Sequence, residues 1–119
     1  MQKNKQLLSI IIPFYNEQEV IEECQNRLSS AVQTIDMNVE MIYINDGSKD
    51  NTLSILTTLL EADSRIKIID LSRNFGKEIA MTAGIDAAKG DAVIVIDADL
   101  QDPPELMVDM ISKWREGFD

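Results

Sequence analysis

The sequence contains no histidine, one cysteine and few aromatic residues, and each shortage excludes a class of site. Without histidine, histidine-based metal sites and catalytic triads are excluded for this segment, and any general base must be a carboxylate. The single Cys24 cannot form an internal disulfide, and its place on the apolar side of a helical pattern predicts a buried structural thiol. Aromatic residues make up 5% of the chain, against 45% for all hydrophobic residues, so we expect an aliphatic core.

Basic residues are also scarce, since 11 Lys and Arg stand against 21 Asp and Glu, which gives a net charge of −10. This balance argues against nucleic acid as a partner, because nucleic-acid binders need clustered Lys and Arg. It also argues against adhesion of this segment to an anionic membrane. No apolar run is long enough to span a bilayer, and residues 1–5 carry no signal-peptide pattern. We therefore expect a cytoplasmic location.

Apolar strands alternate with amphipathic helices along the whole sequence. The expected strands are residues 7–12, 41–44, 66–71 and 92–96. The expected helices are residues 17–35, 51–62 and 76–88, and a last helix that begins at Pro103 or Pro104. Strands that are apolar along their whole length, each followed by a helix, indicate an α/β parallel sheet with helices on both faces. At 119 residues, the chain 1–119 is predicted to be a single domain.

Polar residues gather directly after each expected strand. In parallel α/β sheets, ligands bind beyond the carboxyl ends of the strands. Four clusters fall at these ends, which are residues 13–17, 45–48, 72–77 and 97–102. Because all four lie at one edge of the sheet, we interpret them as parts of one site.

The most informative cluster is the acidic one that follows the last strand. If the chain stays extended, Asp97 and Asp99 point to the same side, where two like charges repel unless a cation lies between them. With Gln101 as a third oxygen donor, they predict a Mg²⁺ or Mn²⁺ site that serves a diphosphate. For an isolated pair of this kind, a helix cap and a solvated carboxylate would be the ordinary interpretation. The preceding strand favours the metal, while Asp102 before Pro103 is expected to be only an N-cap.

The clusters after the first two strands could hold a nucleoside. Asp46 could accept a hydrogen bond from a base, although residues 45–48 also favour a tight turn on their own. Tyr15 could pack against a base and Glu17 could bind ribose or base. Alternatively, Asn16 caps the following helix and Glu17 complements its dipole.

The cluster at residues 72–77 supplies the cations of this edge. Arg73 and Lys77 could meet a diphosphate, and Gly76 near a helix start allows close approach of the backbone. A solvated pair of cations is an equally good interpretation.

Together these motifs resemble glycosyltransferase family 2, whose fold is called GT-A. The resemblance covers essentially the whole chain and is carried by residues 10–17, 45–52, 72–78 and 97–105. The last two segments are similar to the polyprenyl-phosphate branch, which includes bactoprenol glucosyltransferases and dolichyl-phosphate mannose synthases.

The resemblance implies the Rossmann-like nucleotide-binding half of a GT-A fold. It also implies inverting, metal-dependent transfer of a sugar from a UDP-glucose-like donor to a polyprenyl phosphate. Asp99 and Gln101 would bind Mg²⁺ or Mn²⁺ with the diphosphate, and Asp97 would lie at the ribose and metal edge. The remaining residues implied for the nucleotide-sugar site are Pro13, Tyr15, Glu17, Asp46 and Lys77.

The length departs from the family, whose members continue through strands that carry the acceptor side and the candidate base, and usually through membrane helices. We therefore expect a domain truncated on its C-terminal side, with no catalytic base before residue 119. Membrane contact, at the inner face of the cell membrane, would come only through the missing segments. Such a piece should bind nucleotide weakly, lack turnover alone, and could self-associate through uncovered apolar surface.

Four alternatives compete with this interpretation. The acceptor could be a polysaccharide or another non-lipid molecule, or the chain could be a non-catalytic nucleotide-binding module. A phosphoacceptor receiver domain fits less well, because it needs an acidic cluster where residues 13–15 stand. A dinucleotide-binding dehydrogenase fits least, because no glycine-rich turn follows the first strand.

Overall fold

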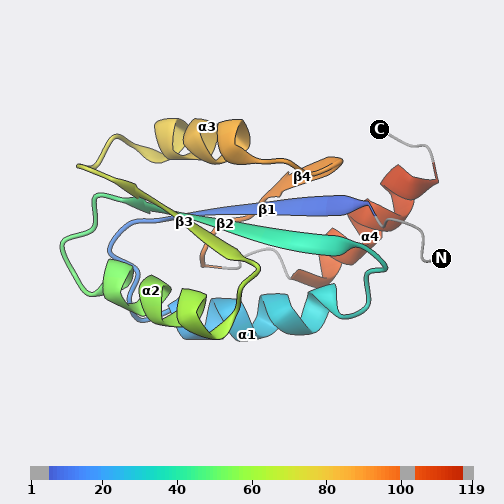
Figure 1. Ribbon diagram of the computed structural model, residues 1–119, viewed down its shortest axis with the longest axis horizontal. Helices are drawn as coiled ribbons and strands as arrows, with labels where there is room; N and C mark the ends of the chain where they lie inside the picture. Colours follow the sequence, from blue (N-terminus) through green and yellow to red (C-terminus); the bar gives the residue numbers. More distant parts are fainter. Residues whose placement is uncertain (1–5, 100–103, 117–119) are drawn as a thin grey trace.

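The computed structural model describes residues 6–99 and 104–116, in which four strands and four helices alternate (Figure 1). The strands are β1 (Leu7–Phe14), β2 (Asn38–Asp46), β3 (Ile66–Leu71) and β4 (Ala92–Val95). The helices are α1 (Ile21–Val32), α2 (Thr52–Ala62), α3 (Lys77–Ala87) and α4 (Pro104–Arg115). All paired strands are parallel and the sheet order is β3-β2-β1-β4, which confirms the predicted fold class.

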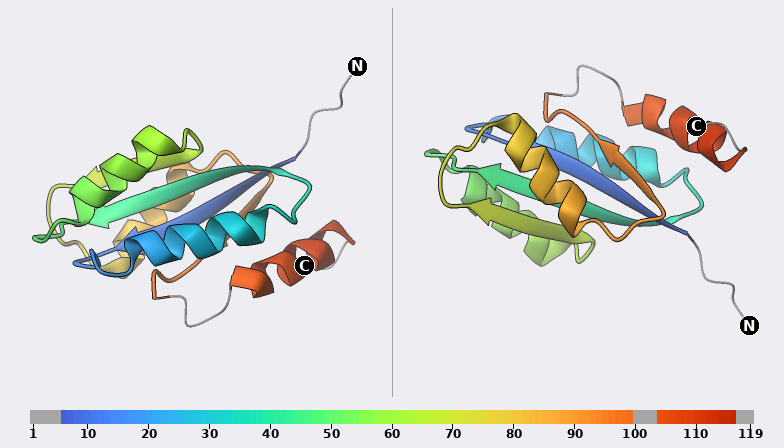
Figure 2. Two further views of the ribbon diagram at one scale, coloured as in Figure 1. Left: turned by 90° about the horizontal axis from the view of Figure 1, so that it is seen from below. Right: turned by 90° about the horizontal axis from the view of Figure 1, so that it is seen from above.

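Helices cover both faces of the sheet, as the apolar strands predict. In Figure 1, α3 lies on one face while α1 and α2 lie on the other, and Figure 2 shows α4 running beside α1. The larger core cluster fills the space under α1, α2 and α4, and a smaller cluster of Ile11, Ile42, Ile44 and Ala80 lies under α3. Cys24 is buried in the larger cluster, which confirms the predicted buried thiol, and burial raises the pKa of Cys24 to about 12.

The central strands β1 and β2 are buried on both faces, whereas the edge strand β4 is not. Side chains of Val93 and Val95 share a face with Ser9 and Ile11, toward α3, yet remain 44% and 36% exposed. The cause is the position of α3, which packs over β1 and β2 rather than over β4. The expected uncovered apolar surface is therefore present, and self-association through it stays a prediction. None of the described helices is both long and apolar enough to cross a membrane.

The sequence predicted that the first strand ends before Pro13, but Pro13 lies inside β1, which continues to Phe14. Ile11 accepts a hydrogen bond from the Ile96 N–H, so its backbone groups face β4, and those of Pro13 two residues later face the same way. β4 ends at Val95, so no ladder bond is lost at Pro13, which still pairs in register with Ile44 of β2.

A buried polar network ties the start of the sheet to the turn between α3 and β4. The Glu40 carboxylate accepts hydrogen bonds from the Ser9 hydroxyl, from Lys67 Nζ at 2.6 Å and from the Lys89 N–H at 2.8 Å. The Ser9 Oγ in turn accepts the Gly90 N–H at 2.8 Å. Burial alone would raise the pKa of Glu40, but these hydrogen bonds outweigh it and hold the pKa below its ordinary value.

Replacing Glu40 by glutamine is expected to lower the free energy of unfolding by about 1–3 kcal/mol at neutral pH. The folded-state pKa of Glu40 lies below its ordinary 4.5, so its stabilisation is present above that value and is lost as pH falls through the folded-state pKa. Urea unfolding between pH 3 and 7 should therefore show the wild-type and variant curves converging in acid. Glu61→Gln, at an exposed position of α2, is the control and should leave the curve unchanged. A difference in the free energy of unfolding between the wild type and Glu40→Gln that stays constant at every pH would contradict the prediction.

Candidate nucleotide and metal site

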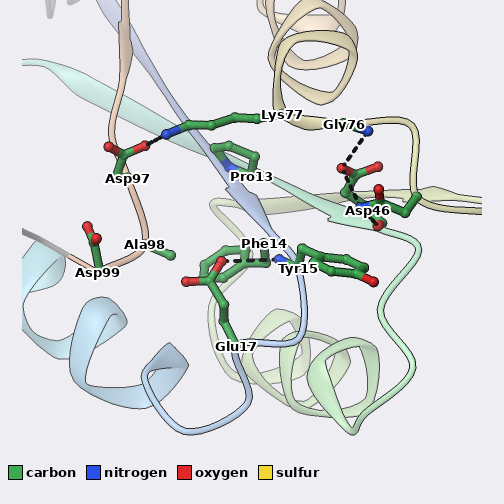
Figure 3. Close-up of a pocket in the computed structure, with 11 residues that line it drawn as sticks. Pro13, Phe14, Tyr15, Glu17, Asp46, Gly76, Lys77, Asp97, Ala98 and Asp99 are labelled. Atoms are coloured by element: carbon green, nitrogen blue, oxygen red, sulfur yellow. Dashed lines mark hydrogen bonds and ion pairs between the residues drawn. The ribbon is translucent and has the colours of Figure 1, made fainter.

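A pocket of about 370 Å³ opens at the carboxyl ends of β1, β2 and β4. The chain places β2 and β3 on one side of β1 and β4 on the other, so the pocket lies where the strand order reverses. Asp99 lines the pocket, as do all six residues predicted for the nucleotide-sugar site: Pro13, Tyr15, Glu17, Asp46, Lys77 and Asp97 (Figure 3). The structure thus brings together side chains that come from four separate segments.

The end of β1 forms one wall of the pocket. Phe14 is buried and packs edge-to-face on Tyr43, with the ring centroids 5.3 Å apart, while Tyr15 is 42% exposed. The Tyr15 N–H donates to Glu17 Oε1 at 3.1 Å. Burial raises the pKa of Glu17, and the nearby charges of Asp99 and Asp97 raise it further. Glu17, Asp97 and Asp99 are therefore like charges that act on one another in this pocket.

Asn16 does not cap α1, which begins only at Ile21. Asn16 has a φ of 51°, and it joins the loop after β1 to the loop after β2. Its N–H donates to Ser48 Oγ at 2.9 Å, and its side-chain oxygen accepts the Lys49 N–H at 2.8 Å. The predicted helix start was therefore wrong, because these contacts between loops replace the cap.

Asp46 holds the loop that leads into α3. One carboxylate oxygen accepts the Phe75 N–H at 2.8 Å, and the other accepts the Gly76 N–H at 3.1 Å and the Asn74 side-chain amide at 3.2 Å. Sequence reasoning predicted a base contact for Asp46 and missed this backbone role. Asn74 also lines the pocket; its only signal in the sequence is its place in the polar cluster at residues 72–77.

Lys77 is the first residue of α3 and crosses the pocket to the end of β4. Gly76 precedes it with a φ of 99°, a conformation that favours glycine, and the Gly76 N–H is fixed by Asp46. From this start the Lys77 ammonium forms an ion pair with Asp97 Oδ1, as Figure 3 shows. The hydrogen bond with Asp97 raises the pKa of Lys77, and the charges of Asp97, Asp99 and Glu17 act in the same direction.

The predicted metal ligands can be placed only in part. Asp97 and Asp99 lie at the same side of the pocket, and Gln101 lies outside the described residues. In residues 6–99 and 104–116, no group of three or more Cys, Asp or Glu side chains is arranged to hold a metal ion. Two carboxylates nevertheless fit Mg²⁺ or Mn²⁺ beside a diphosphate, because such ions take one or two protein carboxylates and fill the other positions with phosphate and water.

Arg73 is separated from this pocket, unlike Lys77. Its guanidinium lies over the ring of Phe75, 4.7 Å from the ring centroid, and it lines a neighbouring hollow that contains Lys49 and Ser48. Of the two cations that the sequence offered to a diphosphate, Lys77 alone has its side chain in the described part of the pocket.

Residues 9–119 match the sequence model of the family described as Glycosyl transferase family 2. The chain is 53% identical over 111 residues to "Uncharacterized glycosyltransferase YkcC" of Bacillus subtilis, which covers 93% of this chain and 34% of that protein. It is 44% identical over 112 residues to "Bactoprenol glucosyl transferase" of Shigella phage SfV, covering 94% of this chain and 36% of that protein. The chain thus spans about a third of the length of these relatives.

Among solved structures, a mannosyltransferase from Pyrobaculum calidifontis in complex with GDP-Man and Mn²⁺ superimposes with a TM-score of 0.76. The match covers 94% of this chain and 32% of that chain at 23% sequence identity. At this identity the likeness establishes the fold, and it agrees with the GT-A architecture that the sequence motifs imply.

Proposed function

The chain belongs to glycosyl transferase family 2, and we propose that it is the donor-binding portion of an enzyme that transfers a sugar from a nucleotide-diphosphate sugar to a polyprenyl phosphate. The observation that carries the proposal is the charge pattern of the pocket. Asp97 and Asp99 lie on one side, and the cation of Lys77 reaches them from α3. This arrangement suits a diphosphate with a divalent cation, because carboxylates attract the cation and the ammonium attracts phosphate oxygens.

Each residue of the pocket then has a task in donor binding. Asp97 and Asp99 hold Mg²⁺ or Mn²⁺, joined by Gln101, and Lys77 pairs with the diphosphate. Tyr15 packs against the base next to Pro13, Glu17 binds ribose or base, and Asp46 offers its carboxylate to a base N–H. A bound divalent cation neutralises charge on the departing diphosphate.

The acceptor proposal rests on the motif resemblance and on the name of the phage relative, which is a bactoprenol glucosyl transferase. A phosphate acceptor is already an anion, so it demands less of a general base than an alcohol would. We place that base, and the membrane contact at the inner face of the cell membrane, in parts of the protein outside these 119 residues. Transfer with inversion at the anomeric carbon follows from the same resemblance.

Titrations of the 119-residue chain with UDP, UDP-glucose and GDP, each with and without a divalent cation, test the proposal. We expect weak binding, with a Kd in about the millimolar range, that tightens when the cation is present. Amide NMR signals should shift for residues 13–17, 46 and 97–99 when Mg²⁺ is used. Binding that ignores the cation, or shifts confined to other surfaces, would overturn the proposal. If the full-length protein transferred sugar to a soluble saccharide but not to polyprenyl phosphate, the proposed acceptor would be wrong.

A further inference from the structure

The ion pair between Lys77 and Asp97 joins the start of α3 to the segment after β4 across the pocket. Both side chains are about half exposed, at 58% for Lys77 and 51% for Asp97. Figure 3 shows the Lys77 side chain extended from the start of α3 toward the Asp97 carboxylate. The ammonium therefore sits at the carboxylate that the proposed function assigns to a divalent cation.

The charges around Lys77 explain why it lies there. Asp99 and Glu17 line the same pocket as Asp97, and the charges of all three carboxylates favour the protonated form of Lys77. Like charges in one pocket repel one another unless a cation lies between them. In the protein without metal, the ammonium of Lys77 offsets this repulsion.

We propose that Lys77 is a positioning residue that holds Asp97 while the pocket contains no divalent cation, and that it exchanges Asp97 for the diphosphate when the cation binds. This inference rests on the proposed function, since it requires Asp97 to be a ligand of the cation. The exchange would strengthen the coupling between cation and donor, because a bound diphosphate draws away the ammonium that competes for Asp97.

The backbone around Lys77 suits such an exchange. The Gly76 N–H donates to Asp46 and Ala80 of the same helix is buried against the sheet, so the backbone at Lys77 is anchored on both sides. Its flexible four-carbon stem is largely exposed, and an exposed ion pair contributes little stability. Only the side chain has to turn, from Asp97 toward the open pocket.

The test is Lys77→Met, measured by Mn²⁺ binding in electron paramagnetic resonance titrations with and without UDP. Without nucleotide, the variant should bind Mn²⁺ about 2–5-fold more tightly than the wild type, because the competing ammonium is gone. With Mn²⁺ saturating, it should bind UDP more weakly. The factor by which UDP tightens Mn²⁺ binding should be smaller than in the wild type but stay above one, because the diphosphate still coordinates the cation. If Lys77 had a purely structural role, its replacement would not strengthen Mn²⁺ binding and weaken UDP binding at the same time.

Lys49→Met is the matched control, because it removes the same charge from the neighbouring hollow outside the pocket. An equal gain in Mn²⁺ affinity in the control would overturn the exchange and reduce it to a general charge effect. Unchanged or weaker Mn²⁺ binding by Lys77→Met, with normal binding by the wild type, would also overturn it and leave the proposed function standing. Mn²⁺ bound by none of the proteins, even with UDP, would overturn both. Thermal melting should show that both variants fold.

Discussion

Replacing Gly47 by alanine is expected to lower the free energy of unfolding by about 3–4 kcal/mol. Gly47 has a φ of 70°, and a Cβ atom there would lie 2.2 Å from the carbonyl carbon of Arg73 and 2.2 Å from the backbone nitrogen of Asn74. Neither backbone atom can turn aside as a side chain would. The loop that Asp46 holds would therefore be pushed away from β2. Urea unfolding followed by circular dichroism measures the loss.

Gly76→Ala is the control that shows how much of the loss at Gly47 comes from backbone strain and how much from the steric clash. Gly76 has a φ of 99°, but a Cβ atom there would meet nothing within 4 Å, so only the strain of about 1–2 kcal/mol is expected. An equal loss of stability in the two variants would contradict the prediction, because it would mean that residues 73–74 yield freely to the new methyl group.

Replacing Asp99 by asparagine is expected to abolish most of the gain in UDP affinity that Mn²⁺ provides. Removing even an outer partner of a metal ligand costs about 10–100-fold in metal affinity, so loss of a ligand charge should cost at least about 10-fold. Asparagine keeps the size of the side chain and removes only its charge. Calorimetric titration with UDP at several Mn²⁺ concentrations measures how the UDP affinity depends on Mn²⁺.

Asp86→Asn is the control for this experiment, because it makes the same chemical change at an exposed position of α3 outside the pocket. It should retain the wild-type response to Mn²⁺. If Asp99→Asn also retained that response, the acidic segment after β4 would have no part in binding the cation, and the donor site would have to be sought elsewhere.

The sequence predicts the sheet because the patterns that form it are local. The apolar runs of β1 and β2 are long enough to be recognised in the sequence, and the polar residues that follow them must meet at one edge of a parallel sheet. Gathering of Pro13, Asp46 and Asp97 around one pocket therefore follows from topology alone. Their roles in binding stay predictions.

The contacts between loops could not be predicted, because they depend on backbone directions that residue patterns do not carry. Asn16 resembles a helix cap in the sequence, yet its positive φ turns it toward Ser48 and Lys49. Asp46 resembles part of a self-contained turn, yet its oxygens reach residues 74–76. In both cases a short polar side chain satisfies the backbone of a distant segment instead of its own.

The carboxylate of Asp46 positions the start of α3 through two consecutive backbone amides. The hydrogen bonds run to the main chain of Phe75 and Gly76, so they do not depend on which side chain position 75 carries. The side chain at position 75 could therefore change while α3 still begins at the same point. Substitutions at this position would then leave the start of the helix in place.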